Sequence, residues 1–238
     1  ERRIHSTPYA DLQTQSESTL LASIDRHNLL MRETAYYNVL GPLLMGMYNN
    51  VLKSRLAKVG VDFTSFNLTE GMQEIADFDP VTFLRRLNTD FRALTPDQQK
   101  TVRESSYAEL HHNQSLGDFP KKVSTIIERF GHLSDNGNDF FSSLWREKPD
   151  MILNLVTEFE PVKEEGQKVS LADLRSKGQV NYPLKLFYKR AREFRLLRER
   201  ISSLYTYGYG LFRYYYLALG AHFTQNGIID TPEDIFYL

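Results

Sequence analysis

The C-terminal part of the chain carries an apolar pattern that only a very long helix satisfies. After Pro183, which suits a first helical turn, no proline occurs until Pro232, and apolar side chains recur at heptad spacing from Tyr182 to about Asn226. About 45 residues at about 1.5 Å each make a rod of about 65–70 Å. A compact domain cannot enclose such a rod, so other helices must lie along it. Its apolar stripe comprises Leu184, Phe187, Ala191, Phe194, Ile201, Tyr205, Gly208, Phe212, Tyr215 and Leu219.

Helical periodicity also runs over residues 16–60. Ser16 or Ser18 can cap the start, and Gly60 suits the C-terminal end. Because Pro42 removes a backbone donor and crowds the preceding turn, we expect Gly41-Pro42 to kink or break this helix. One face of the segment carries Leu20, Ile24, His27, Met31 and Ala35.

Shorter helices are expected between these two segments. Residues 61–78 look irregular, with one helical turn at most. Cap residues predict helix starts at Asp79-Pro80, Thr95-Pro96 and Asp118, then near Pro149 and Ser170, with a capped turn at 231–234. No strand alternation or internal repeat is present. The sequence therefore predicts an all-α fold, a single elongated multi-helix domain over residues 1–238 organised along the long C-terminal helix.

Composition excludes several classes of site. The chain has 238 residues, of which 41% are hydrophobic, and it has no cysteine, so disulfides, thiolate metal sites and a Cys nucleophile are excluded. A formal net charge of -1 gives no overall case for nucleic acid or an anionic membrane as a partner. With no apolar run long enough to span a bilayer and no signal peptide, we expect a cytoplasmic protein. The polar start at Glu1 and the apolar end suggest a piece of a longer chain.

The segment 131–148, "GHLSDNGNDFFSSLWREK", predicts an unusually long loop between two helices. Its oxygen donors, Asp135, Asn136, Asn138 and Asp139, are suitable ligands for a hard cation, but their spacing does not match a calcium loop, and we expect no metal site. The same residue types also form turns that bond their own backbone. The loop is therefore either self-structured and packed beneath Trp145, or a surface that touches a ligand or another domain.

Two parts of the long helix are candidate binding surfaces. In "KLFYKRAREFRLLRER", residues 185–200, the cations Lys185, Lys189 and Arg192 share a stripe that could receive phosphates, although a solvated helix face is the simpler interpretation. Arg198 falls on the apolar stripe and needs a carboxylate or carbonyl partner, which we do not expect the adjacent Glu199 to provide. The aromatic run 205–216, "YTYGYGLFRYYY", predicts core packing or, alternatively, a cavity for a large apolar ligand.

No catalytic motif is present. The six histidines include no HExxH pair, and there is no phosphate-binding glycine loop, nucleophile elbow or dinucleotide fingerprint. From the residues alone, the chain is a helical interaction or substrate-binding domain.

Two segments nevertheless resemble a known family. "FGHLSDNGNDFFSSLWREKPDMILNLV", residues 130–156, is similar to the "GH…W.E.P..ll" segment in the helical domain of phosphoenolpyruvate-utilising phosphotransferases, the multidomain enzymes related to phosphoenolpyruvate synthase and rifampicin phosphotransferase. Residues 188–238 resemble the final helix of that domain, where "lG..l...G.i..peDIFfL" leads into a swivelling phosphohistidine domain. The loop lacks the Arg after His132 and the Glu of the rifampicin branch, so the resemblance is to the wider family.

The resemblance implies that this chain is a catalytically inert substrate-binding or linker domain. An ATP-grasp domain would precede it and a phosphohistidine domain would follow it, so ATP and Mg would belong to the parent enzyme, an ATP-dependent phosphotransferase of the dikinase type. The implied contact residues for a substrate or for the moving domain are His132, Asp135, Asn138, Asp139 and Trp145 in the loop, with Arg192, Arg195 and Arg198 on the same face if the long helix packs against it. A freestanding helical ligand- or protein-binding module is the alternative.

Overall fold

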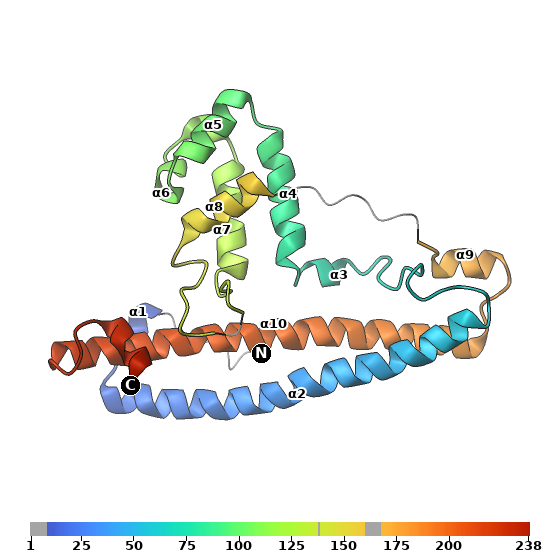
Figure 1. Ribbon diagram of the computed structural model, residues 1–238, viewed down its shortest axis with the longest axis horizontal. Coiled ribbons are helices and arrows are strands. Elements are labelled where there is room, and N and C mark those ends of the chain that lie inside the picture. The colour runs from blue at the N-terminus through green and yellow to red at the C-terminus, as the bar shows by residue number, and fades with distance from the viewer. Residues whose placement is uncertain (1–8, 138, 160–167) are drawn as a thin grey trace. The chain divides into compact units, whose positions relative to one another are not determined.

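The computed structural model describes residues 9–137, 139–159 and 168–238 (Figure 1). The all-α prediction is confirmed: helices dominate, and the β pairing within these ranges is an isolated bridge between Phe66 and Val169. The helices are α1 (Tyr9–Leu12), α2 (Glu17–Ala57), α3 (Gln73–Ala76), α4 (Pro80–Arg92), α5 (Pro96–Glu104), α6 (Tyr107–Leu110), α7 (Phe119–Phe130), α8 (Pro149–Glu158), α9 (Leu171–Ser176) and α10 (Tyr182–Gln225), with 3-10 helices η1 (Gln114–Leu116) and η2 (Pro232–Tyr237).

The chain divides into two compact units. Of the described residues, unit 1 comprises 9–33, 80–137, 139–159 and 204–238, and unit 2 comprises 34–79 and 168–203. The two long helices, α2 and α10, therefore contribute residues to both units. The single domain expected over residues 1–238 remains a prediction. No helix in the described ranges is long and apolar enough to cross a membrane.

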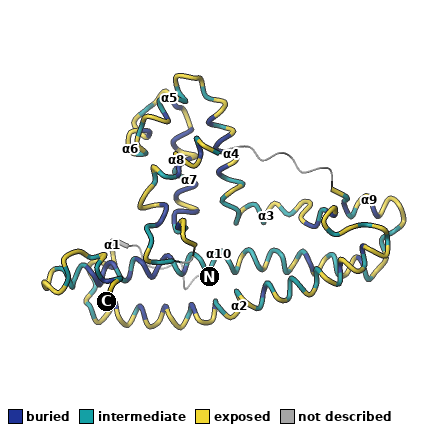
Figure 2. Tube along the Cα trace, viewed as in Figure 1, coloured by how far each residue is buried: buried dark blue, intermediate teal, exposed yellow. Residues whose placement is uncertain are grey.

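The long C-terminal helix is present as predicted, and α2 packs against it in the antiparallel direction (Figure 1). In unit 1, Leu20, Ile24 and Met31 of α2 share a core with Phe212 and other residues of α10. In unit 2, Leu52 and Leu56 share a second core with Leu184 and Ala191. Figure 2 shows buried residues recurring along both helices, as the heptad stripe requires.

Gly41-Pro42 was expected to kink or break the N-terminal helix. The break is wrong, because α2 is continuous from Glu17 to Ala57 with Pro42 inside it, and the kink remains a prediction. Gly41, next to this proline, lies where α2 contacts α10. A Cβ built on Gly41 would lie 3.7 Å from Ile201 Cδ1 and 3.9 Å from the Cα of Arg198, so α2 and α10 approach closely here. Tertiary contact along the helix thus overrides the local propensity of proline.

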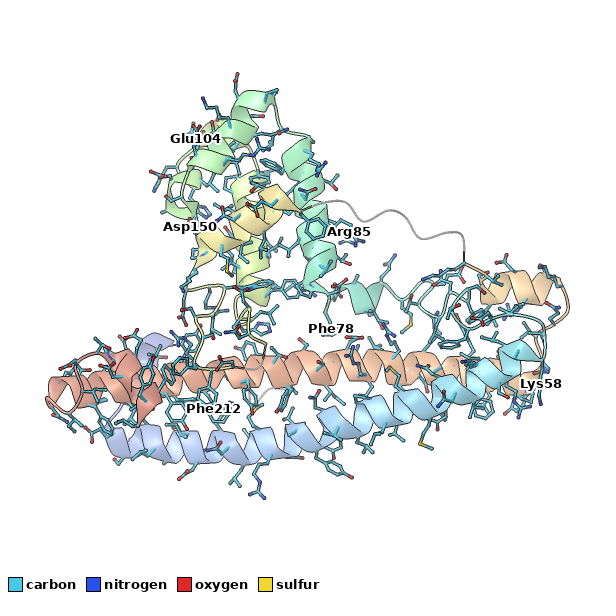
Figure 3. All side chains as sticks on the ribbon, viewed as in Figure 1. Lys58, Phe78, Arg85, Glu104, Asp150 and Phe212 are labelled. Carbon is cyan, nitrogen blue, oxygen red and sulfur yellow. The ribbon has the colours of Figure 1, made fainter. Side chains whose placement is uncertain are left out.

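Unit 1 also contains the shorter helices α4 to α8, which enclose their own apolar core. Capping boxes begin α5 at Thr95 and α6 at Ser106, and the extended Ser105-Ser106 backbone separates these two helices. Asp118 occupies the cap position of α7 as expected, but its side chain makes no capping hydrogen bond. At the start of α6, the Tyr107 amide donates a hydrogen bond to Asp150 of α8 at 2.5 Å (Asp150 is labelled in Figure 3).

Unit 2 combines the middle of the chain with the start of α10. Residues 61–78 contain the single helical turn α3, and a capping box at Ser170 begins α9, both as predicted. The amides of Asn67 and Val169 donate to the carbonyls of Val169 and Ser65, each at 2.8 Å, and so tie the irregular segment to the residues before α9.

Candidate functional site

The long loop between α7 and α8 is closed at its base by its own backbone. The Trp145 amide donates to the Leu133 carbonyl at 2.8 Å, and the Arg146 amide donates to the Gly131 carbonyl at 3.1 Å. Gly131 is required at this closure, since a Cβ there would lie 2.8 Å from Arg146 Cβ. The two ends of the loop are therefore joined.

Polar side chains of the loop bond mainly to the loop itself. Asp135 Oδ1 accepts a hydrogen bond from Trp145 Nε1 at 3.1 Å. Asp139 accepts from the Ser142 hydroxyl and the Phe141 amide, each at 2.8 Å, and these bonds, with the charge of Arg213, lower the pKa of its carboxyl. No group of three or more potential metal-ligating side chains is found in the described ranges. Asn138, which the sequence also singled out, lies outside the described residues.

Trp145 belongs to the core of the short helices. Only 8% of its surface is exposed, and it packs in the same cluster as residues of α4, α7 and α8. It can therefore position the loop, whereas Asp135 and Asn136 are the exposed polar residues next to it. His132 is partly buried, and its ring lies edge-on to Tyr207 with centroids 5.1 Å apart.

The loop is attached to α10 by Arg213, a residue that the sequence analysis did not select. Arg213 is 5% exposed, and its Nε donates to both carboxylate oxygens of Glu147 at 2.8 and 2.9 Å. Its Nη1 donates to the Phe141 carbonyl at 2.7 Å. A buried guanidinium needs such compensation, because desolvating an unpaired charge is very costly. One side chain thus joins α10 to two points of the loop.

Arg213 could have been found from the sequence, since it is the only Asp, Glu, Lys or Arg between Arg200 and Asp230. A single charge inside an apolar helical run predicts a buried and paired group. Its partner Glu147 carries no comparable signal, because it lies in a segment where charges are common. The apolar stripe instead predicted a partly buried arginine at Arg198.

Arg198 is partly buried as predicted, but the prediction that the adjacent Glu199 cannot be its partner is wrong. Arg198 has 40% of its side chain exposed, and its Nη1 donates to Glu199 Oε1 at 2.7 Å, although the two residues are adjacent. Both side chains are long enough to bend towards each other once the arginine is at the edge of the apolar stripe. Arg195 lies 3.4 Å from the same carboxylate.

The loop also contacts α10 through its backbone and through an aromatic ring. A Cβ on Gly210 would lie 3.0 Å from the His132 carbonyl oxygen, so a larger residue here would require the loop backbone to shift by a few tenths of an ångström. Phe140 packs among Tyr209, Phe212 (labelled in Figure 3) and Tyr216 of α10. The aromatic run 205–216 therefore serves core packing, as the simpler interpretation predicted.

The loop also contacts the C-terminal 3-10 helix η2. The ring of Phe141 lies 5.5 Å from that of Phe236 and 5.2 Å from that of Tyr237. The Arg213 guanidinium lies 5.4 Å from the Phe236 ring centroid. Phe141 is 43% exposed, so the loop and the end of the chain together present aromatic surface.

The three selected arginines of α10, Arg192, Arg195 and Arg198, belong to unit 2, whereas the loop belongs to unit 1. Their expected common face with the loop remains a prediction. Arg192 donates through Nη1 to the carbonyls of Leu68 at 3.1 Å and Glu70 at 2.6 Å. It also lines a pocket of about 700 Å³ within unit 2, together with the cations Arg175, Lys185 and Lys189.

Comparison of this chain with protein-family models, with curated proteins and with solved structures found no match. The contacts described above are therefore the basis for any assignment of function, beside the resemblance of the two sequence segments.

Proposed function

We propose that this chain is a non-catalytic helical substrate-binding or linker domain of an ATP-dependent, phosphoenolpyruvate synthase-like phosphotransferase that works through a phosphohistidine carrier. Its partners are the ATP-grasp and phosphohistidine domains of the same polypeptide, and its compartment is the cytoplasm. ATP and Mg are required by the parent enzyme and bind outside this chain.

The observation that carries the proposal is the attachment of the loop to both α10 and η2. Arg213 bonds to Glu147 and to the Phe141 carbonyl, while Phe141 contacts Phe236 of the "DIFYL" end. In the family that residues 188–238 resemble, this end is the hinge to the phosphohistidine domain. A loop packed against that hinge is well placed to receive the moving domain each time it swings.

The contact surface of the loop follows from exposure. Asp135, Asn136 and Phe141 are exposed, and His132 and Asp139 are partly exposed. Hydrogen bonds hold both carboxylates in fixed positions, so binding a partner orders few additional side chains. The proposed surface is therefore pre-organised around its exposed aromatic residue.

The alternative function, a freestanding helical binding module, is favoured by a different observation. Tyr36, Val39, Leu43 and Met47 of α2 in unit 2 are 61–64% exposed and lie at helical spacing on one face. An apolar helix face of this kind is typical of a protein-binding surface. This face could bind a partner protein whether or not the chain belongs to a phosphotransferase.

The first experiment that tests the proposal measures the molecular mass of the native gene product, by blotting with an antibody raised against this domain. We expect a band several times larger than 27.7 kDa. The purified native protein, incubated with ATP labelled in its β- and γ-phosphates, should acquire acid-labile, base-stable label, whereas the 238-residue chain alone should acquire none. A native band at 27.7 kDa would favour the freestanding module.

A variant of the native protein tests the role of the loop. Phe141→Ser should slow the labelling at least about tenfold, because it removes the exposed ring next to the hinge. Leu155→Ser is the matched control, since Leu155 is 38% exposed on α8 of the same unit and should leave the rate unchanged. Equal rates for the two variants would contradict docking at the loop, even if the native protein is labelled.

A further inference from the structure

Unit 2 contains a pocket formed by three segments that are distant in the sequence. Residues 71–74 at the start of α3, α9 and the first half of α10 surround a cavity of about 700 Å³. This volume lies within the range of about 300–1,000 Å³ that is usual for small-molecule sites. The pocket is formed within unit 2 alone, so it is independent of the loop in unit 1.

The charged residues of the pocket favour an anion. Four cations, Arg175, Lys185, Lys189 and Arg192, line it against two carboxylates, Glu74 and Glu193, which leaves an excess of two positive charges (4 − 2). Glu193 is further offset by Arg190, which lies 2.8 Å away. Among the residues that the structure describes, neither Arg175 nor Lys185 has a carboxylate partner, so both are available to a ligand.

Arg192 is held in place at this pocket. Its Nη1 donates to the carbonyls of Leu68 and Glu70 and to the Tyr188 hydroxyl at 2.7 Å, and its guanidinium lies 5.1 Å from the Tyr188 ring centroid. All of these bonds use Nη1, so within the described part of the chain Nε and Nη2 remain for a further acceptor. A guanidinium that is already oriented loses little entropy when it binds a planar or tetrahedral oxyanion.

Apart from Gly71 and the polar Gln73, the uncharged lining is largely apolar. Met72, Leu171, Tyr188 and Leu196 contribute to it, and all four are partly buried. A bare inorganic anion would leave this surface in contact with water. A ligand that carries an apolar group beside its anionic group would cover it, which gains about 25 cal/mol for each Å² removed from water.

We propose that this pocket binds a small organic phosphate monoester, with the phosphate at the cluster of Arg175, Lys185, Lys189 and Arg192 and the organic group against Tyr188 and its apolar neighbours. A phosphate monoester carries about −1.5 to −2 charges near neutral pH, which matches the excess of two positive charges in the lining. This inference does not rest on the proposed phosphotransferase function, because it concerns a binding site in unit 2 and its test requires neither ATP nor neighbouring domains.

The test is calorimetric titration of the 238-residue chain with phenyl phosphate, inorganic phosphate and phenol. We expect one saturable site for phenyl phosphate, at least about tenfold weaker binding of inorganic phosphate, and no saturable binding of phenol. The double variant Arg175→Ala with Lys185→Ala should weaken phenyl phosphate binding at least about tenfold. Circular dichroism checks that this variant is folded, which the exposure of both side chains leads us to expect.

The matched control is Lys177→Ala with Arg200→Ala. It also removes one lysine and one arginine from exposed positions of unit 2, but neither residue lines the pocket. We expect less than about a twofold change in affinity for it. If both double variants weaken phenyl phosphate binding equally, the effect is general charge attraction and the proposed binding site is wrong. Absence of saturable phenyl phosphate binding at millimolar concentration, or equal binding of phenol, would overturn it as well.

Discussion

Replacing Arg213 by Met should destabilise unit 1 far more than the loss of an ordinary ion pair. The side chain of Arg213 is 6% exposed, and that of its partner Glu147 is 26% exposed. Removing one partner of a buried pair costs about 3–5 kcal/mol, because the other charge remains without compensation. Glu147 is an exposed residue whose carboxylate can return to water, so we expect less than that range, about 2 kcal/mol in the free energy of unfolding, from the lost hydrogen bonds to charged groups.

The assay can follow the loop directly. Trp145 is the only tryptophan of the chain, and its Nε1 donates to Asp135 within the same loop. Urea titrations followed by tryptophan fluorescence therefore report on the attachment of the loop, and far-ultraviolet circular dichroism reports on the helices as a whole. We expect the fluorescence transition of Arg213→Met to move to lower urea concentration than that of the wild type.

Lys122→Met is the control for this prediction. Lys122 and Asp90 also lie 2.8 Å apart in unit 1, but their side chains are 51% and 40% exposed. An exposed pair contributes about 0–1 kcal/mol, so this control should shift the transition little. If Arg213→Met costs less than about 1 kcal/mol, or no more than Lys122→Met, then Arg213 does not anchor the loop.

Three further predictions follow from single contacts. Burial lowers the pKa of His27 and outweighs the opposite effect of its bond to Gly208, so protonation of this residue is less favourable in the folded chain than in the unfolded chain. The free energy of unfolding should therefore fall as the pH drops below about 6.5. Urea titrations at several pH values should show a smaller decrease for His27→Gln than for the wild type. Pro42→Ala restores a backbone donor inside α2 and should raise the free energy of unfolding by about 1–3 kcal/mol, whereas a loss would mean that packing requires the proline. Asp135→Ala removes the acceptor of Trp145 Nε1 and should cost about 1 kcal/mol and change the emission maximum; an unchanged spectrum would contradict that bond.

Several helix ends were predictable because short-range interactions set them. Thr95 with Gln98, and Ser170 with Asp173, form capping boxes between residues three apart. Gly60 has φ of +75° just after α2 ends, a conformation that other residues disfavour. The heptad stripe likewise predicted α10, since repeated apolar spacing is a property of the helix itself. For these features the sequence contains the whole physical cause.

The candidate loop was located from its composition, but its attachment was not. Asp135, Asp139 and Trp145 were selected because their residue types are unusual in a connecting loop. The residue that holds the loop, Arg213, lies 66 positions from its partner Glu147. Pairing at that separation depends on how α10 lies against the loop, and no local pattern encodes it.

The sequence by itself determined the all-α class, the long helix and most helix starts, because hydrophobic spacing and capping act within a few residues. Only the tertiary structure decided that α2 continues through Pro42, that Arg213 and not Arg198 is the buried cation, and that Lys185 and Arg192 line a common pocket with residues of α3 and α9. Each of these depends on what lies opposite the residue in space. Burial and pairing of charges are properties of the packed chain, since the cost of removing a charge from water is decided by its neighbours.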